Sequence, residues 1–353
     1  MDIGEPLRAG PKTTARPGDF WKQVAGYVLA AACLVWVFHD THIQRMAEHI
    51  GSMTWWWVLP AICCDVLGYV CDGIRWRWLL FPVGRLPVLR ATQAIYVGLF
   101  TNEVMPMRFG ELVRGYLASR WLGRPFMEVV PSMLVCRLMD GVWTAAGIGL
   151  VAIFVPLPGD LLLAGDIFGA VVLLLAGALL FLFLREPEVV ERWMETPASK
   201  RGVLASLRRG VGATARRLRA IGEWRRLAVA GVASLGFLFF EILAFWFIME
   251  AYRLRLPLSA GAAVFLILRL GTALPNAPAN VGSYQFFTVL GLSLFGIEKT
   301  RATGFSVVVF ILLTLPLWAL GLLALSRSGL TLAKLREEVR TLVRSGAGPG
   351  LAG

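Results

Sequence analysis

Charged side chains gather between Asn102 and Asp140, in a chain that is otherwise strongly apolar. Glu111 and Arg114 are three positions apart, and Arg137 and Asp140 repeat this spacing. Residues three apart on a helix share a face and can form an ion pair. A charged side chain at bilayer depth costs about 2.5–3.5 kcal/mol on insertion scales. We therefore expect these four groups to be paired or hydrated, and to mark a functional site.

The arginines in this stretch suit an anionic ligand. An arginine presents a planar fork of donors that matches a phosphate group. The helical segment that begins near Gly110 turns its free N–H groups inward, and a helix N-terminus favours an anion. Arg108 and Arg114 lie beside it. The sequence thus predicts a site for a phosphate-like head group, with Glu111 and Asp140 balancing charge or carrying a coupling proton. The alternative is a charge network that only holds the structure together.

A second polar stretch, Pro275–Gln285, interrupts an apolar segment with the sequence PNAPANVGSYQ. Its amides and hydroxyls suit hydroxyl or carbonyl groups of a ligand, although the same side chains can instead cap an unwound tip. The candidate substrate-binding residues from the two stretches are Asn102, Glu103, Arg108, Gly110, Glu111, Arg114, Arg137, Asp140, Pro275, Asn276, Pro278, Asn280, Gly282 and Gln285. No catalytic residue, metal ligand or cofactor is expected.

Composition places the chain in a membrane. Hydrophobic residues make up 57% of the sequence, and several segments exceed the roughly 18 apolar residues that span hydrocarbon. The net charge of +12 lies mostly in loops and tails, where basic residues set topology and contact anionic inner-leaflet lipid. The basic runs lack interleaved aromatic residues, so no nucleic-acid partner is expected. The five cysteines lie in apolar segments without metal-ligand spacing, as small hydrophobic residues do.

The expected fold class is an all-α polytopic membrane protein with about six transmembrane helices and two re-entrant helical hairpins in an inverted-repeat arrangement. The expected organisation is a disordered cytoplasmic tail over residues 1–20, a single transmembrane domain over 21–326 and a basic cytoplasmic tail over 327–353, with a basic amphipathic cytoplasmic loop over 185–226. The expected spans are residues 21–38, 55–80, 126–155, 161–184, 227–251 and 300–325. Both termini are then cytoplasmic, and residues 39–54 form an outer loop.

Two segments have halves that are too short to be ordinary spans. Pro106 breaks residues 91–122, the Pro275–Gln285 stretch breaks residues 259–296, and proline cannot continue a helix. Basic residues flank both outer ends of the first segment, which predicts a hairpin that enters from the cytoplasm. The second hairpin is predicted to enter from outside. Paired broken helices in inverted repeats form a substrate site near the membrane midplane. A proline-kinked ordinary helix at each place is the alternative.

Several other polar residues lie within the expected spans. Asp65 and Asp72 share a helix face, and either add to the polar site or line the bundle interior. Glu241 lies near the middle of its span, and Arg269 precedes the second break. The run Arg75–Trp78 alternates arginine with tryptophan, which is typical of a membrane interface.

Three runs of this sequence resemble a known family. They are RFGELVRGYL at Arg108–Leu117, RLMD at Arg137–Asp140 and PNAPANVG at Pro275–Gly282. They are similar to the flippase-like transmembrane domain of lysylphosphatidylglycerol synthases, over about residues 21–325. The resemblance implies that the family positions are Gly110, Glu111, Arg114, Arg137, Asp140, Pro275, Pro278 and Gly282.

The sequence departs from that family in two places. Ala279 and Asn280 stand where a glycine is more usual. The synthases also continue into a soluble aminoacyl-transfer domain, whereas this chain ends at Gly353. The resemblance therefore implies the lipid-moving part alone, as in stand-alone relatives tied to hopanoid and glycolipid pathways.

We therefore expect a lipid transporter or flippase rather than an enzyme, with membrane lipids as its partners, in a bacterial inner membrane. The alternatives are an enzyme that modifies a lipid head group and a non-transporting scaffold that recruits partners through the basic loop. The three histidines lie in one outer loop, away from the charged stretch, which disfavours a zinc site. Glu103, Glu111 and Asp140 are candidates for acid–base chemistry. The oligomeric state is left open.

Overall fold

The computed structural model of the chain describes residues 17–104, 109–155, 158–184, 224–273, 278–330, 334–335 and 337–338, and over these ranges its regular elements are all helices. Within the described ranges, five helices are long and apolar enough to cross a membrane. They are α3 (Val58–Leu80, preceded by the 3-10 turn η1, Trp55–Trp57), α6 (Phe126–Phe154), α7 (Gly159–Leu184), α10 (Trp224–Ala251) and α13 (Lys299–Arg327). The prediction of an all-α polytopic membrane protein is confirmed.

A bent pair of helices supplies the sixth candidate span. Helix α1 (Pro17–Phe38) is followed by the short helix α2 (Ile43–Gly51), at an angle of 82°. Since α1 begins at Pro17, where proline's fixed φ suits a first helical turn, the tail predicted over residues 1–20 extends too far. The loop predicted over residues 39–54 is also partly wrong, because α2 lies within it.

Two helical hairpins lie between the long helices. The first joins α4 (Val88–Val104) to α5 (Gly110–Leu122), and the second joins α11 (Leu258–Thr272) through η3 (Pro278–Asn280) to α12 (Ser283–Ser293). The contacts across each pair run antiparallel. All four helices are shorter than the roughly 20 residues needed to cross hydrocarbon. The breaks fall where the prolines predict them, although residues 105–108 and 274–277 lie outside the described ranges.

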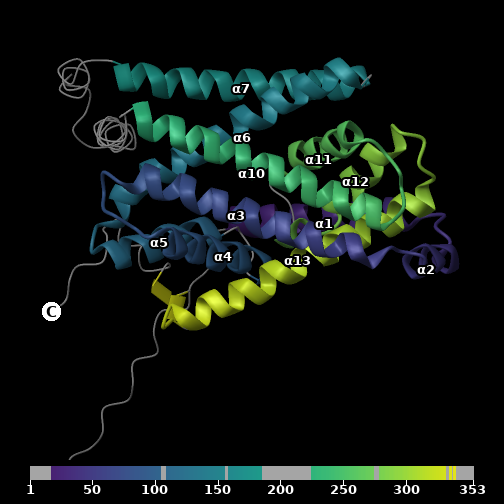
Figure 1. The fold of residues 1–353 in the computed structure, drawn as a ribbon, viewed down its shortest axis with the longest axis horizontal. Helices are drawn as coiled ribbons and strands as arrows, with labels where there is room; N and C mark the ends of the chain where they lie inside the picture. Colours follow the sequence, from purple (N-terminus) through teal and green to yellow (C-terminus); the bar gives the residue numbers. More distant parts are fainter. Residues whose placement is uncertain are drawn as a thin grey trace, which may run out of the picture.

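The two hairpins belong to two units, α3–α6 and α10–α13, that run in opposite directions. Helices α3 and α10 pack side by side and antiparallel, since Thr54, at the start of the first, donates its N–H to Ala251, at the end of the second, at 2.9 Å. The hairpin that follows each helix therefore starts from the opposite end of the molecule, and Figure 1 shows α4–α5 and α11–α12 in opposite halves. This is the chain direction that an inverted repeat requires.

The packing between the units is reciprocal. Helix α4 of the first unit packs on α13 of the second, and α11 of the second packs on α6 of the first. A glycine permits each contact, because a Cβ at Gly321 would lie 2.6 Å from Phe100 and a Cβ at Gly147 would lie 3.1 Å from Leu266. The two glycines lie at nearly the same distance from the start of two 29-residue helices.

The apolar core is divided into two clusters. One is built around Phe245, Phe305 and the second hairpin, and the other around Trp76, Leu117 and the first hairpin. Helix α7 lies at the edge of the bundle, where it packs mainly on α6 (Figure 1). The amphipathic helix predicted within residues 185–226 lies almost wholly outside the described residues.

Candidate functional site

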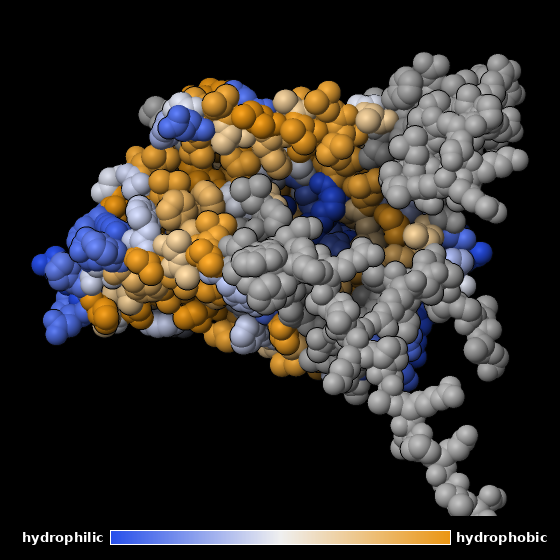
Figure 2. Space-filling view, turned by 180° about the vertical axis from the view of Figure 1, so that it is seen from behind, coloured by the Kyte–Doolittle hydropathy of each residue, from blue (hydrophilic) through white to orange (hydrophobic). Residues whose placement is uncertain are grey.

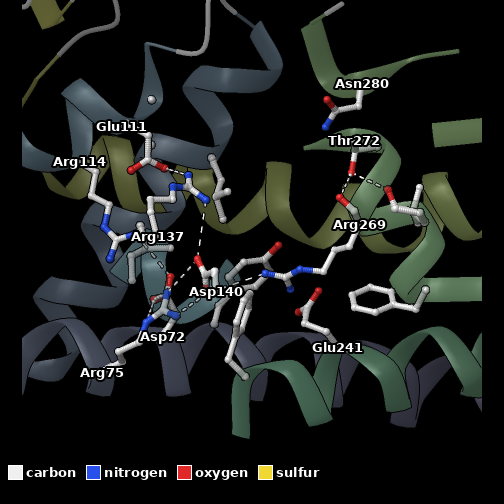
Figure 3. Close-up of a pocket in the computed structure, with 18 of the residues that line it drawn as sticks. Asp72, Arg75, Glu111, Arg114, Arg137, Asp140, Glu241, Arg269, Thr272 and Asn280 are labelled. Carbon is white, nitrogen blue, oxygen red and sulfur yellow. Dashed lines mark hydrogen bonds and ion pairs between the residues drawn. The ribbon is translucent and has the colours of Figure 1, made fainter. Parts of the chain in front are cut away.

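A cavity of about 240 Å³ lies between the two apolar clusters. Its lining comes from both hairpins and from the long helices α3, α6 and α10. The charged residues in this lining are Asp72, Arg75, Glu111, Arg114, Arg137, Asp140, Glu241 and Arg269. Figure 3 shows them converging on a common space. Four arginines and four carboxylates in one apolar bundle are costly unless they neutralise one another.

Arg75 is the central cation of this network, with a relative exposure of 1%. Its Nε donates to Asp72 Oδ1 at 3.0 Å, and its guanidinium also donates to both carboxylate oxygens of Asp140. A further donor reaches the hydroxyl of Ser234 at 3.2 Å. Because these partners come from α3, α6 and α10, one guanidinium ties together three long helices. The fixed fork of five N–H donors makes arginine the side chain suited to this position.

Arg114 holds the first hairpin against α3. It is 6% exposed, its guanidinium carbon lies 4.1 Å from the ring centre of Trp76, and its Nη1 lies 3.6 Å from Asp72 Oδ2. Its Nε finds no hydrogen-bond partner among the described residues. Stacking and ion pairing together fix this guanidinium, so Arg114 positions the hairpin more than it offers a free cation.

Arg137 is the cation that a ligand can reach. Its side chain is 58% exposed, although it pairs with Glu111 and lies 3.8 Å from Asp140 Oδ2. Figure 2 shows hydrophilic atoms in a hollow on one face of the molecule, with apolar surface along part of its border. A guanidinium that is both paired and exposed can exchange a carboxylate partner for a phosphate without entering bulk hydrocarbon.

Arg269 extends the network to the second hairpin. Its Nη2 lies 3.9 Å from Asp140 Oδ1, and its guanidinium carbon lies 5.3 Å from the ring centre of Phe237. Asp140 therefore accepts ion pairs from Arg75, Arg137 and Arg269. This single carboxylate on α6 links α3 to both the exposed arginine and the second hairpin.

The ion-paired part of the network carries an excess of positive charge. Its four arginines share three carboxylates, those of Asp72, Glu111 and Asp140. Glu241 lines the cavity, but it forms no ion pair within 4 Å among the residues that the structure describes. The paired groups thus sum to one net positive charge. The cavity as a whole keeps this excess, which favours an anionic ligand, when Glu241 is protonated.

The structure brings six of the predicted site residues to the cavity wall. They are Gly110, Glu111, Arg114, Arg137, Asp140 and Asn280. Asn280 comes from the second hairpin, and η3, which contains it, contacts α4 of the first. The two hairpins therefore meet at this site, which the sequence left open.

Four predicted residues lie elsewhere, and three of them, Asn102, Gly282 and Gln285, form hydrogen bonds at the hairpin breaks. Asn102 Oδ1 accepts the N–H of Gly110 at 2.7 Å and so caps the start of α5. Gln285 Oε1 accepts the N–H of Gly282 at 2.8 Å at the start of α12. The Glu103 carboxylate accepts a hydrogen bond from the Trp318 side chain on α13. None of these four lines the cavity. Arg108, Pro275 and Asn276 lie outside the described residues, and Pro278 is described only as the start of η3.

The sequence interpretation of Arg75 is wrong. It is completely buried with Trp76, whereas Arg77 is exposed at the same helix end. A signal was present, because Asp72 and Arg75 have the same three-residue spacing as the two pairs that were recognised. Glu241 and Arg269 were noticed as single charges, but no spacing along the chain relates them to the first hairpin.

Comparison with known proteins gives two findings. The family model described as the lysylphosphatidylglycerol synthase TM region matches residues 23–321. A UPF0104 membrane protein of Methanothermobacter thermautotrophicus is 22% identical over 333 residues, which cover 90% of this chain and 94% of that protein. The family match contains the whole charged cavity, both hairpins and most of α1 and α13. The chain is a multi-pass membrane protein that belongs to the family of the lysylphosphatidylglycerol synthase transmembrane region.

Proposed function

We propose that this protein is a lipid transporter that moves an amphipathic lipid with an anionic or polar head group across the membrane, as a flippase does. The observation that carries this proposal is the exposed Arg137 in a cavity whose ion-paired groups have one excess positive charge. In this proposal the head group binds there while the acyl chains stay in the surrounding hydrocarbon. The lipid leaves chemically unchanged, so the protein is not an enzyme.

The proposal treats α4–α5 and α11–α12 as re-entrant hairpins that meet near the middle of the membrane. Non-helical backbone at membrane depth is tolerated where it lines a cavity or is buried in protein. Both breaks lie next to the charged cavity, which is lined by Gly110 after the first and by Thr272 and Asn280 around the second. Inverted repeats place substrate sites at this position.

The distribution of basic residues supports a cytoplasmic position for the end of the molecule where α3 ends and α10 begins. The cations near this end are Arg77, Arg85, Arg90, Arg120, Arg124, Arg225, Arg226, Arg327 and Lys334, and those near the other end are Arg45, Arg253, Arg255, Lys299 and Arg301. The positive-inside rule then places both ends of the transmembrane domain in the cytoplasm. We propose the inner membrane as the location, with anionic lipid against this basic end.

Removing the exposed guanidinium tests the proposal. Arg137→Ala is expected to slow translocation of a fluorescent anionic phospholipid in liposomes on the order of ten- to a hundredfold, because a charge-assisted hydrogen bond contributes about 1.5–3 kcal/mol. Arg137→Lys keeps the positive charge but loses the planar fork of donors. Its translocation rate is expected to lie between those of Arg137→Ala and the unmodified protein. The measurement is the rate at which labelled lipid moves between leaflets, after checking that all variants reconstitute equally.

Arg124→Ala is the matched control, since Arg124 is an exposed arginine in the turn between α5 and α6, away from the cavity. Its translocation rate is expected to equal that of the unmodified protein. Equal rates for Arg137→Ala and the unmodified protein would contradict the proposed site. Mass spectrometry of the recovered lipid tests the enzymatic alternative. A change in the mass of the head group would indicate that the protein modifies the lipid.

A further inference from the structure

Two carboxylates on the facing helices α3 and α10 have no arginine within 4 Å among the described residues, unlike Asp72, Glu111 and Asp140. Asp65 on α3 is 3% exposed, and its Oδ2 has no hydrogen-bond partner among the described residues. Glu241 on α10 likewise has a buried Oε1 without a partner. Neither forms an ion pair within the part of the chain that the structure describes. An ionised carboxylate in such surroundings is costly, and the protonated form is the cheaper one.

The two groups lie on facing surfaces of the antiparallel pair α3 and α10. Asp65 and Gly68 are on one face of α3, since they are three residues apart. A Cβ at Gly68 would lie 2.9 Å from Glu241 Oε1, so the Glu241 carboxyl packs on the backbone one turn after Asp65. The absence of a side chain at residue 68 creates the space that the carboxyl occupies.

The titratable neighbours of this acid pair are mainly tyrosines. Tyr69 on α3 and Tyr96 on α4 pack ring against ring at 5.2 Å, and the Tyr96 hydroxyl is buried without a hydrogen-bond partner. Tyr284 on α12 and Asp72 on α3 also interact electrostatically with the pair. Asp72 is already paired with Arg75 and Arg114. The unpartnered oxygens of Asp65, Glu241 and Tyr96 can each accept a hydrogen bond. A proton added to one of the two carboxyl groups is the simplest donor.

Arg269 is the cation that faces Glu241, from α11. It lies 3.9 Å from Asp140, and Figure 3 shows its side chain between Asp140 and Glu241. When Glu241 is neutral, Asp140 is the stronger partner for this guanidinium. When Glu241 loses its proton, two carboxylates compete for Arg269. The protonation of Glu241 can thus decide how tightly the second hairpin is held to α6.

We propose that Asp65 and Glu241 form a proton-carrying site that couples lipid movement to a transmembrane proton gradient. The inference rests on the proposed transport function. A proton passes from water in the cavity to Glu241, which lines it, then to Asp65, and finally to water on the other side; no bond to the lipid is formed or broken. Asp65 lies about 10 Å along α3 from Asp72, toward the Trp55–Trp57 end. This assigns the coupling proton to a different acid pair from Glu111 and Asp140, which are both held by arginines.

The first experiment measures translocation with and without a proton gradient. A fluorescent phosphatidylglycerol is followed in vesicles of phosphatidylglycerol and phosphatidylethanolamine, with an imposed gradient of about one pH unit. For one proton per lipid, such a gradient shifts the steady-state ratio of labelled lipid between leaflets by up to about tenfold. Asp65→Asn is expected to abolish this shift while keeping gradient-free exchange, because Asp65 does not line the cavity. Asp166→Asn, an exposed acid on α7, is the matched control and keeps the shift.

A second measurement detects the proton without transport. Infrared difference spectra of the reconstituted protein are expected to show a protonated carboxyl band that disappears in Asp65→Asn or Glu241→Gln and persists in Asp166→Asn. Translocation by the unmodified protein with no response to the gradient would overturn the coupling proposal and leave the proposed transport intact. If no lipid moves at all, the infrared spectra test the proton site by themselves. A protonated carboxyl band that is unchanged in both variants, or the absence of such a band, would reject the site.

Discussion

Replacing Arg75 by methionine is expected to lower the free energy of unfolding by about 3–5 kcal/mol, because it leaves a buried ion network without its central cation. Arg75 is 1% exposed and bonds to both Asp72 and Asp140, on two different helices. Methionine has a similar length but no donors, so the loss is electrostatic rather than a cavity. We expect a strongly reduced yield of monodisperse protein and a lower melting temperature in detergent. Both are measured by size-exclusion chromatography of heated samples.

Arg77→Met supplies the control, since Arg77 lies two residues away on α3 and is exposed. Surface substitutions usually change stability by less than about 0.5 kcal/mol. A melting temperature for Arg75→Met equal to that of Arg77→Met would show that the network does not depend on this guanidinium.

Gly110→Ala is expected to displace the first hairpin with a loss of stability above the usual range of about 1–3 kcal/mol for overpacking. A Cβ at Gly110 would overlap the carbonyl oxygen of Gly98, and a Cβ at Gly98 would lie 2.7 Å from the carbonyl oxygen of Gly110. The obstacle is backbone in both cases, so no side-chain rotation relieves it. Moving α5 away from α4 also pulls Arg114 from Asp72, which should lower both the melting temperature and lipid translocation.

The matched substitution is Gly149→Ala on α6, where an added Cβ meets nothing within 4 Å. Alanine is favoured over glycine in a helix by up to about 1 kcal/mol, so this variant should be at least as stable as the unmodified protein. If Gly110→Ala melted at the same temperature as Gly149→Ala, the close approach of α4 and α5 would not be required for the fold.

The long helices and both hairpin breaks were predictable from the sequence, because hydropathy and proline act locally. Residues 126–155, 227–251 and 300–325 were expected as spans, and α6, α10 and α13 begin and end within three residues of these limits. The helix α2 was missed, since nine residues give too short a pattern to separate a helix from a loop.

The site was predictable only as far as spacing along one helix allowed. The pairs Glu111/Arg114 and Arg137/Asp140 were recognised from spacing. The second is observed, with Arg137 Nη1 3.8 Å from Asp140 Oδ2, whereas Glu111 pairs with Arg137 and Arg114 pairs with Asp72. Spacing shows which residues share a helix face, whereas the neighbour that this face meets depends on packing between helices. For the same reason Arg75 was assigned to the membrane interface and Asn102 was expected as a binding group, whereas capping was already an alternative for the stretch that contains Gln285.

The reciprocal packing of the two units limits how the protein can open. Each hairpin packs on the last helix of the other unit, α4 on α13 and α11 on α6. Each unit is therefore held by the other through two separate contacts. Tilting one unit as a rigid body would separate both of these contacts at once, and also the long interface between α3 and α10. A movement confined to one hairpin breaks far less packing. In the proposed transport function, access to the cavity from the two sides of the membrane would therefore alternate through the hairpins themselves, with α3, α6, α10 and α13 as a static frame.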